Sequence, residues 1–239
     1  RMVAEYGEDF ADEHRFQVPE GCHWNDVRET PANVGTAIAG AMRGIERDNQ
    51  KHLYGVFGDA QWTNKDRLPD DLLKDLVEHF SALPLGNTVA KSDIIGDAYE
   101  YLIKQFADAT NKKAGEFYTP QEVSTILAKI VTTGKTSLKN VYDPTCGSGS
   151  LLLRVAKEVE EVGGFYGQEM NPTTYNLARM NMILHGVHYK RFDLRNEDTL
   201  ENPDPDHAEM QFDAIVANPP FSAKWSASTV HESDDRFSS

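Results

Sequence analysis

The residues Asn218-Pro219-Pro220-Phe221 bring together groups that could hold a planar amine or amide. An asparagine side chain and a proline carbonyl accept hydrogen bonds, and a phenylalanine ring offers a stacking surface. The apolar run Ile215-Val216-Ala217 before them predicts a buried strand, which must end at the prolines because neither can donate a ladder hydrogen bond. We therefore expect Asn218 on a stiff turn at the carboxyl end of a strand, where open α/β sheets bind ligands. Alone, the stretch is equally compatible with a strand and an ordinary loop.

A glycine-rich turn lies upstream, where Val141-Tyr142-Asp143 predicts a strand that leads into residues 144–150 and then into a helical run, 151–162. Gly147 and Gly149 would let the backbone turn tightly and approach a ligand closely. The phosphate-binding pattern G-x-G-x-x-G is not matched, since position 152 is Leu, and there is no P-loop lysine. The acid at Asp143 would repel phosphate. It favours a cationic or amine-bearing ligand such as S-adenosylmethionine, which has a sulfonium, an amino group and no phosphate.

A second acid follows another short predicted strand, residues 164–169. Glu169 lies 22 residues after Gly147. That spacing is close to the offset of about 20 residues at which a carboxylate holds ribose hydroxyls in nucleotide-binding βαβ units. Asn171-Pro172 then predicts a capped helix, whose apolar positions include Leu177, Met180, Ile183 and Leu184 and which Gly186 ends.

Strands alternate with helices over the rest of this half. A third strand is expected at 189–194, with Asp198-Thr199 in the loop beyond it, and a fourth at 213–217. This alternation predicts an α/β fold with a Rossmann-like, doubly wound parallel sheet. Asp143, Glu169, Asp198 and Asn218 would then lie at or just beyond the carboxyl ends of neighbouring strands. Each acid alone is more often a solvated loop residue, so their convergence carries the argument.

The stretch 115–122 predicts the start of a helix. Thr119 and Glu122 have capping-box spacing, and Pro120 would occupy the first helical position. Gly134 is expected to stop the helix. Its predicted buried stripe consists of Val123, Ile126, Leu127, Ile130 and Val131.

The amino-terminal segment predicts helices and no strands. Residues 1–20 are charged and weakly patterned, which favours a loop or tail. Three apolar groups at helical spacing follow, and we expect them to be core rather than partner surface. Pro69 is expected near the start of the second helix, where its missing N–H costs nothing, and Ser92 or Asp93 would cap the third. We predict a small, partial helical domain over 1–111 before a catalytic domain over 112–239. The groups are Val34, Ala37, Ile38, Met42 and Ile45; Leu68, Leu72, Leu73, Leu76, Val77 and Phe80; and Ile94, Ile95, Ala98, Tyr99, Leu102, Ile103 and Phe106.

Composition limits the function classes. The formal net charge is −14, which argues against an autonomous DNA-binding protein, because such a surface usually carries a basic patch. Cys22 and Cys146 are the only cysteines, which excludes a disulfide framework and favours the reducing cytoplasm. No C-x-x-C or H-E-x-x-H spacing indicates a metal site, and no apolar run is long enough to predict a membrane span.

The ends of the sequence indicate a fragment. It begins at Arg1 without an initiator methionine and ends in a polar run, 226–239, soon after the Asn218 turn. We expect the catalytic domain to be truncated at its carboxyl end, and missing strands would leave a sheet edge exposed.

These motifs, in this order, resemble those of DNA adenine-N6 methyltransferases. More narrowly, the chain resembles the modification subunit of type I restriction–modification systems. The resemblance is strong over about 92–221 and rests on residues 115–120, 143–151, 167–172 and 218–221, with support from 97–102 and 177–182. It implies transfer of a methyl group from S-adenosylmethionine to a flipped adenine at specific DNA sites. It also implies partners: a specificity subunit that contacts the DNA and, in the full complex, a restriction subunit.

The resemblance also implies roles for individual residues. Asn218, Pro219, Pro220 and Phe221 would hold the target base, Glu169 the ribose hydroxyls of the cofactor, and Asp198 its adenine amino group. The family continues beyond the Asn218 motif with more strands, so we expect the catalytic domain of this sequence to be incomplete. The residues expected to bind the cofactor are Glu116, Phe117, Tyr118, Thr119, Pro120, Gln121, Asp143, Thr145, Gly147, Ser148, Gly149, Ser150, Glu169 and Asp198.

Three alternatives stay open at this point. Asn-Pro-Pro-aromatic motifs also serve methyltransferases that act on protein glutamine or RNA bases, because a planar amide needs the same two acceptors. The chain could instead be a non-catalytic cofactor-binding module for assembly. A generic nucleotide-binding α/β domain is disfavoured by the missing phosphate pattern.

Overall fold

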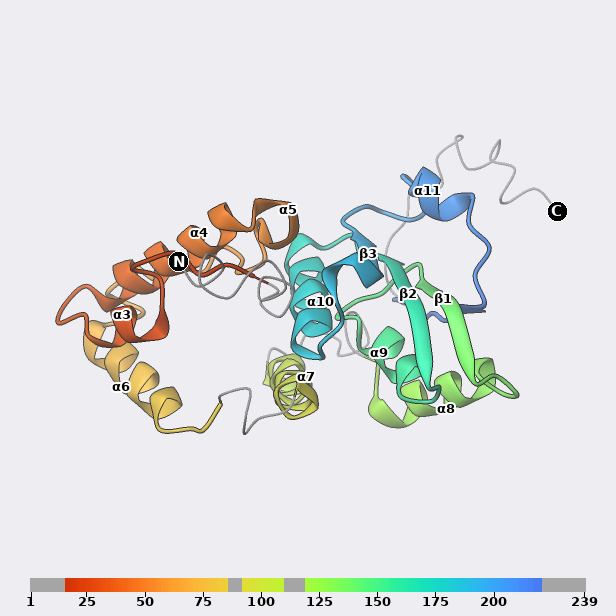
Figure 1. The fold of residues 1–239 in the computed structure, drawn as a ribbon, viewed down its shortest axis with the longest axis horizontal. Coiled ribbons are helices and arrows are strands. Elements are labelled where there is room, and N and C mark those ends of the chain that lie inside the picture. Colours follow the sequence, from red (N-terminus) through yellow and green to blue (C-terminus); the bar gives the residue numbers. More distant parts are fainter. Residues whose placement is uncertain (1–15, 86–91, 110–118, 221–239) are drawn as a thin grey trace, which may run out of the picture.

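The protein is described by a computed structural model that covers residues 16–85, 92–109 and 119–220. A group of helices forms one end of the molecule, and a parallel sheet with its covering helices forms the other (Figure 1). The helical end contains α3 (Trp24–Arg28), α4 (Val34–Asp48), α5 (Gln50–Leu53) and α6 (Asp70–Ser81). As the sequence predicts, its described residues form no strand. Its core consists of Val27, Val34, Ile38, Ala41, Leu73 and Val77.

The start of α4 shows how this end is held together. Asn33 precedes the helix in the left-handed conformation, with φ at 58°. The Asp70 carboxylate accepts hydrogen bonds from the amides of Asn33, at 2.8 Å, and Val34, at 3.2 Å. Asp70 is also the first residue of α6, so one carboxylate ties the two helices together. Pro69 lies at the N-cap of α6, near the start of the helix as predicted.

Helix α7 (Ser92–Ala109) lies beside the sheet half rather than among the first helices, and it packs against α10 (Figure 1). Because α7 begins at Ser92, both residues expected as its cap fall inside the helix, and that boundary prediction was wrong. The domain division predicted at residue 111 lies in the segment 110–118, outside the described residues, and it stays a prediction.

The sheet contains β1 (Ser137–Asp143), β2 (Glu161–Gln168), β3 (Phe192–Arg195) and β4 (Ala214–Ile215) in the order β3-β2-β1-β4. All three pairings are parallel. The order reverses between β1 and β4, since the chain adds β2 and β3 on one side of β1 and then returns to its other side. This is the doubly wound parallel sheet that the alternating pattern predicts.

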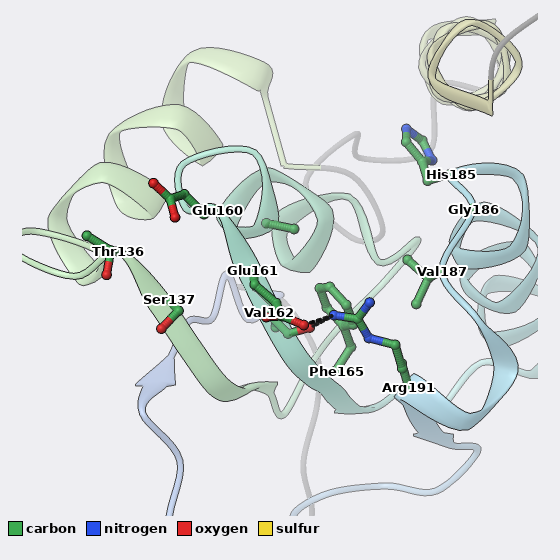
Figure 2. A pocket seen from close by; sticks show the side chains of 11 residues that line it. Thr136, Ser137, Glu160, Glu161, Val162, Phe165, His185, Gly186, Val187 and Arg191 are labelled. Atoms are coloured by element: carbon green, nitrogen blue, oxygen red, sulfur yellow. Dashed lines mark hydrogen bonds and ion pairs between the residues drawn. The ribbon is translucent and has the colours of Figure 1, made fainter.

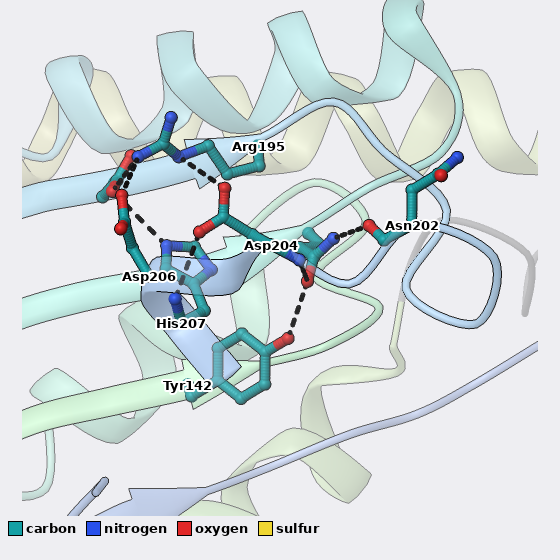
Figure 3. Close-up of polar contacts among 8 residues, drawn as sticks. Tyr142, Arg195, Asn202, Asp204, Asp206 and His207 are labelled. Atoms are coloured by element: carbon teal, nitrogen blue, oxygen red, sulfur yellow. Dashed lines mark hydrogen bonds and ion pairs between the residues drawn. The ribbon is translucent and has the colours of Figure 1, made fainter. Parts of the chain in front are cut away.

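Helices α8 (Gln121–Val131), α9 (Ser150–Ala156) and α10 (Pro172–Leu184) contribute to one core with the strands. Short α11 (Pro205–Ala208) lies over the strands, with His207 beside Tyr142 (Figure 3). The rings of His207 and Phe212 both contact Tyr142 of β1 and Tyr166 of β2. The fully buried apolar side chains between sheet and helices include Val141, Leu152, Val155 and Met182.

Several boundaries differ from the sequence predictions. Helix α9 ends at Ala156 rather than near residue 162, because Val162 pairs with Leu138 in the sheet. Residues Tyr189–Arg191 form a 3₁₀ turn, so β3 begins only at Phe192. Strand β4 is short, and Ile215 is 58 % exposed, so the predicted buried strand is half-exposed.

The start of α8 also differs from its prediction. Pro120 occupies the N-cap rather than the first helical position, and no side chain caps the helix, so the capping box of Thr119 and Glu122 does not form. The predicted buried stripe was largely wrong: Val123, Ile126 and Ile130 are exposed, whereas Ser124 and Ala128 are buried. Gly134 does adopt a left-handed conformation after the helix, with φ at 74°. Periodicity identified the helix but chose the wrong face.

Helix α10 shows a smaller shift of the same kind. Its buried positions are Thr174, Ala178, Asn181 and Met182. The predicted apolar positions Leu177, Met180, Ile183 and Leu184 are only half-buried. Within the described residues, no helix is both long enough and apolar enough to cross a membrane.

Candidate cofactor and base site

Four predicted site residues lie at or just beyond the carboxyl ends of four neighbouring strands. Asp143 is the last residue of β1, and Glu169 comes directly after β2. Asp198 follows β3, and Asn218 follows β4. Because the strands are parallel, their carboxyl ends share one edge of the sheet, and the four side chains come from the same edge.

The turn after β1 is built by short polar contacts. The Thr145 amide donates to the Asp143 carboxylate at 2.9 Å, and the Cys146 amide donates to the Gln168 carbonyl at the end of β2, also at 2.9 Å. Gly147 and Gly149 have φ of 54° and 76°, a conformation that costs other residues energy. The two glycines therefore allow the chain to turn from β1 into α9.

Buried polar groups hold this turn against α10. The Asn181 side chain donates to the Ser148 carbonyl at 3.0 Å, and the Ser148 and Ser150 hydroxyls lie 3.0 Å apart. All three residues are buried. Sequence reasoning missed Asn181, although a polar residue on the apolar face of a helix indicates such a contact.

Glu169 closes the turn from the β2 side. One carboxylate oxygen accepts from the Gly147 amide at 3.1 Å, and the other accepts from the Asn171 amide at 2.7 Å. Asn171 in turn caps α10, as predicted, by accepting from the amides of Thr173 and Thr174. Each carboxylate oxygen has further acceptor capacity, which ribose hydroxyls could use.

Burial strongly affects the two acids of this turn. Asp143 is 2 % exposed, and burial, with a smaller contribution from the charge of Glu169, raises its pKa to about 7. Burial also raises the pKa of Glu169, although its two amide hydrogen bonds oppose the shift. Two desolvated carboxyls side by side disfavour a bound anion and favour a cation, which would stabilise their ionised forms.

The loop that carries Asp198 is tied to the same turn. The Asp198 carboxylate accepts from the amides of Leu200 and Glu201 at 2.8 and 3.3 Å, and the Thr199 hydroxyl donates to the Pro144 carbonyl. Asp198 is half-buried. Its loop thus lies beside the turn that follows β1.

Gln168, a buried amide that sequence reasoning missed, positions the next part of this loop. Its oxygen accepts from the Tyr142 hydroxyl and the Asp204 amide, both at 3.1 Å, and its nitrogen donates to the Asn202 carbonyl at 3.2 Å (Figure 3). Gln168 is 1 % exposed. A polar residue at the end of a glycine-rich strand was the only sequence signal for it.

Arg195 and His207 extend these contacts over the outer strand. The Arg195 guanidinium lies 2.8 Å from a carboxylate oxygen of Asp193 and 3.4 Å from one of Asp204 (Figure 3). Burial raises the pKa of Asp193, but hydrogen bonds from His207 and Arg195 outweigh it and leave that pKa below its usual range. The cluster fixes α11 to β3, and nothing in it suggests chemistry.

Asn218 contacts the start of α8. Its side-chain nitrogen donates to the Thr119 hydroxyl at 3.2 Å, which leaves its Oδ1 as the acceptor of the amide. The Val216 amide donates to the Tyr142 carbonyl, so Asn218 lies just past the end of β1. Pro219 is exposed, Pro220 is half-buried, and Pro120 and Gln121 are exposed beside Thr119.

Four predicted site residues lie outside the described residues: Glu116, Phe117, Tyr118 and Phe221. The structure does describe a cavity of about 740 Å³, but it lies where β1 and β2 begin, between Thr136, Glu161 and Arg191 (Figure 2). That edge is opposite to the carboxyl ends, so the cavity is not part of this site.

Comparison with known protein families agrees with this geometry. The profile described as N-6 DNA Methylase matches residues 90–239, and the profile described as HsdM N-terminal domain matches residues 2–80. The chain belongs to the N-6 DNA Methylase family. The resemblance noted in the sequence motifs is thereby confirmed.

Curated relatives of this family member include three methylase subunits of type I restriction enzymes. The MpnII subunit of Mycoplasma pneumoniae is 43 % identical over 64 % of this chain and 30 % of its own length. The MjaIX subunit of Methanocaldococcus jannaschii is 27 % identical over 99 % of this chain and 42 % of its own. The HindI subunit of Haemophilus influenzae is 32 % identical over 84 % of this chain and 47 % of its own. The chain thus spans less than half the length of these relatives.

A solved structure confirms the fold. The methyltransferase subunit of a type I restriction-modification system from Streptococcus thermophilus superposes with a TM-score of 0.84 at 34 % identity, over 96 % of this chain and 50 % of that one. A second solved chain, from a study of complex assembly in the type I R-M system, has a TM-score of 0.58 at 23 % identity and supports the fold alone.

Proposed function

We propose that this family member is the catalytic part of a site-specific DNA adenine-N6 methyltransferase subunit of a type I restriction–modification system. The observation that carries the proposal is the shared sheet edge. Two desolvated acids, Asp143 and Glu169, lie there, with Asn218 beyond the adjacent strand. This arrangement suits a cationic methyl donor on one side and a planar amine on the other.

The residues present fit S-adenosylmethionine as the cofactor. Asp143 and Glu169 supply carboxylates, and among the described residues no lysine or arginine lowers the pKa of either acid. Glu169 would hold the ribose hydroxyls, Asp198 the adenine amino group, and the turn containing Thr145, Gly147, Ser148, Gly149 and Ser150 the methionine portion, with Thr119 nearby. When bound, the cofactor would supply a methyl group on its sulfonium, and the amine nitrogen would attack the methyl carbon in line, so that the C–S bond breaks and the neutral thioether leaves.

Asn218 and Pro219 would prepare the nucleophile. The exocyclic amine of adenine is unreactive because its lone pair is delocalised into the ring. Two acceptors on its hydrogens, the Asn218 side-chain oxygen and the Pro219 carbonyl, favour a pyramidal nitrogen and restore the lone pair. The hydrogen bond from the Asn218 nitrogen to Thr119 supports this role, because it fixes which end of the amide accepts. Phe221 would stack on the extruded base.

The family resemblance and the net charge of the chain both support protein partners for DNA binding. A net charge of −14 leaves phosphate contacts to other chains. A specificity subunit would contact the DNA, and a restriction subunit would join in the full complex. We also propose a cytoplasmic location, which two free cysteines support.

The test is Asn218→Ala in the complex with the cognate specificity subunit. Transfer of labelled methyl groups to duplex DNA should fall at least about 100-fold, while calorimetric binding of S-adenosylmethionine stays within about twofold. Asn25→Ala, at an exposed position of α3, is the matched control and should leave both unchanged. Wild-type transfer by Asn218→Ala would refute the assigned role.

The same assay separates the alternatives. Transfer to a protein glutamine or to RNA, but not to duplex DNA, would move the function to the other substrates of such motifs. Cofactor binding without transfer to any of these, even with the specificity subunit present, would favour a non-catalytic assembly module.

A further inference from the structure

Three potential metal ligands lie together far from the carboxyl edge of the sheet. Asp97 and Glu100 are three residues apart on α7 and share one face of that helix. His185 is the residue that ends α10. Ligand atoms from all three lie within 4.8 Å of one another.

His185 is the feature that distinguishes this cluster from ordinary surface acids. Its side chain is only 4 % exposed. Its Nδ1 lies 3.0 Å from the Asn181 carbonyl, which can only accept, so Nδ1 carries the hydrogen. Its Nε2 is buried without a hydrogen-bond partner. In the neutral ring, Nε2 therefore presents a lone pair with nothing to bind.

The Nε2 atom lies close to both acids. Nε2 lies 3.8 Å from a carboxylate oxygen of Asp97, too far for a hydrogen bond but close enough for both atoms to reach one ion. A backbone carbonyl that fixes the other ring nitrogen is the usual support of a metal-binding histidine.

The backbone of α7 is shaped around the ring. A Cβ at Gly96 would come within 2.6 Å of three ring atoms of His185, so only glycine lets α7 approach this closely. Figure 2 shows the imidazole at the end of α10, next to the helix that carries Asp97. The close approach brings the acids of α7 within reach of Nε2.

We propose that Asp97, Glu100 and His185 bind one zinc ion that fastens α7 to the end of α10. One imidazole and two carboxylates form a mixed nitrogen and oxygen set that zinc accepts, whereas magnesium and calcium prefer oxygen ligands alone. A tetrahedral ion about 2.1 Å from each ligand needs ligand atoms about 3.4 Å apart, with water as the fourth ligand. The Asp97 side chain is 61 % exposed, so a rotation of this side chain away from Lys157 could close that gap.

The Lys157 ammonium lies next to the proposed zinc position, because it binds the Asp97 carboxylate. The ammonium donates to the Asp97 carboxylate at 2.8 Å and, with desolvation opposing, keeps the pKa of Asp97 below its usual value. Zinc would compete with Lys157 for the same carboxylate. Removing the lysine should therefore tighten zinc binding. If Asp97 and His185 formed only an ion pair and bound no zinc, removing the lysine would have no such effect.

Neither sequence spacing nor a motif indicated this site, because its ligands come from two helices some 85 positions apart. The proposal does not rest on the methyltransferase assignment, and it is tested without substrate or cofactor.

The experiment is calorimetric titration of chelator-treated protein with zinc chloride, repeated with cobalt(II) to follow its visible absorption. We expect about one zinc per chain with a dissociation constant in the micromolar range or tighter, a raised Tm, and cobalt bands typical of tetrahedral coordination. His185→Asn, Asp97→Asn and Glu100→Gln should each weaken zinc binding at least about 10-fold. Lys157→Gln should strengthen it.

Control variants keep the result interpretable. His79→Asn, at an exposed histidine of α6, should bind zinc like the wild type. If His185→Asn fails to fold, the two carboxylate variants on the surface of α7 decide the question. No zinc bound by the wild type, or equal binding by all three ligand variants, would overturn the proposal.

Discussion

At the residue scale, the buried carboxyl of Asp143 has the most consequences for function. Its pKa of about 7 means that the apoprotein exchanges a proton at this group near neutral pH. The cause is desolvation, reinforced by the neighbouring Glu169. A bound cation would reverse the shift, because it stabilises the ionised carboxylate.

We therefore predict that S-adenosylmethionine binds more tightly as pH rises from 5.5 toward about 7, and that the gain levels off above. The sign follows from linkage: below the pKa of the free protein, binding must first remove a proton from Asp143. Calorimetry at several pH values, in buffers of different ionisation enthalpy, would measure both affinity and proton release.

Asp143→Asn is the control for this prediction, because the amide cannot titrate. The cofactor's own amino group ionises near pH 7.7–8.0, as α-amino groups do, and its contribution would persist in the variant. An unchanged pH profile in Asp143→Asn would show that Asp143 is not the titrating group.

At the element scale, α10 joins the separate parts of the site. Its N-cap Asn171 also donates its own amide to Glu169, and its buried Asn181 holds the Ser148 carbonyl. The residue that follows the helix, His185, lies 3.8 Å from Asp97 of α7. A change at one end of this helix should therefore affect the cofactor turn as well as stability.

Asn171→Ala should lower the free energy of unfolding by about 1 kcal/mol, because the amides of Thr173 and Thr174 lose their acceptor. Denaturant titration measures the loss. Thr173→Ala, at an exposed position in the same turn, should change stability by less than about 0.5 kcal/mol. Equal effects of the two substitutions would show that the cap is unimportant.

Helix α8 shows which features of a helix its sequence pattern predicts and which it does not. Its periodicity predicted a helix, and a helix forms at Gln121–Val131. Periodicity also placed Val123, Ile126 and Ile130 in the core, yet Ala128 and Ser124 face it. The hydrophobic pattern shows that a helix has an apolar face, but tight packing against α9 selects the small residues.

At the scale of the whole molecule, the helical end joins the sheet half through Arg179 of α10. Its guanidinium donates to the carbonyls of His52 and Tyr54, at 2.7 and 2.8 Å, where α5 ends. The His52 and Tyr189 rings stack beside it with centroids 3.7 Å apart. The Phe16 ring also lies near Tyr189, with centroids 6.2 Å apart.

Arg179→Met should weaken this junction by about 1–2 kcal/mol, since two charge-assisted hydrogen bonds are lost while the side-chain stem remains. Amide hydrogen exchange should become faster in α4 and α5 and stay unchanged in β1 and β2. Arg43→Met, at an exposed position of α4, is the matched control. Uniform acceleration in both halves would contradict a local junction.

The overall charge leads to a last prediction. With a net charge of −14, the isolated chain should bind duplex DNA no better than about 10⁻⁴ M at physiological salt, the weak end of non-specific binding. Fluorescence anisotropy over a salt series would measure this. Tight binding with a steep salt dependence would show that the chain contacts phosphates itself.

The sequence by itself determined the alternation of strands and helices, the parallel sheet, the cap at Asn171 and the acids after successive strands. These features depend on local periodicity and on turn residues, which a linear pattern contains. Only the tertiary structure decided which face of α8 is exposed. It also decided that Gln168 contacts Tyr142 and that Arg195 contacts Asp204. The proximity of Asp97, Glu100 and His185 likewise depends on how the helices pack. Each of these depends on which distant segments pack together, because burial and polar pairing are properties of neighbours in space rather than in the chain.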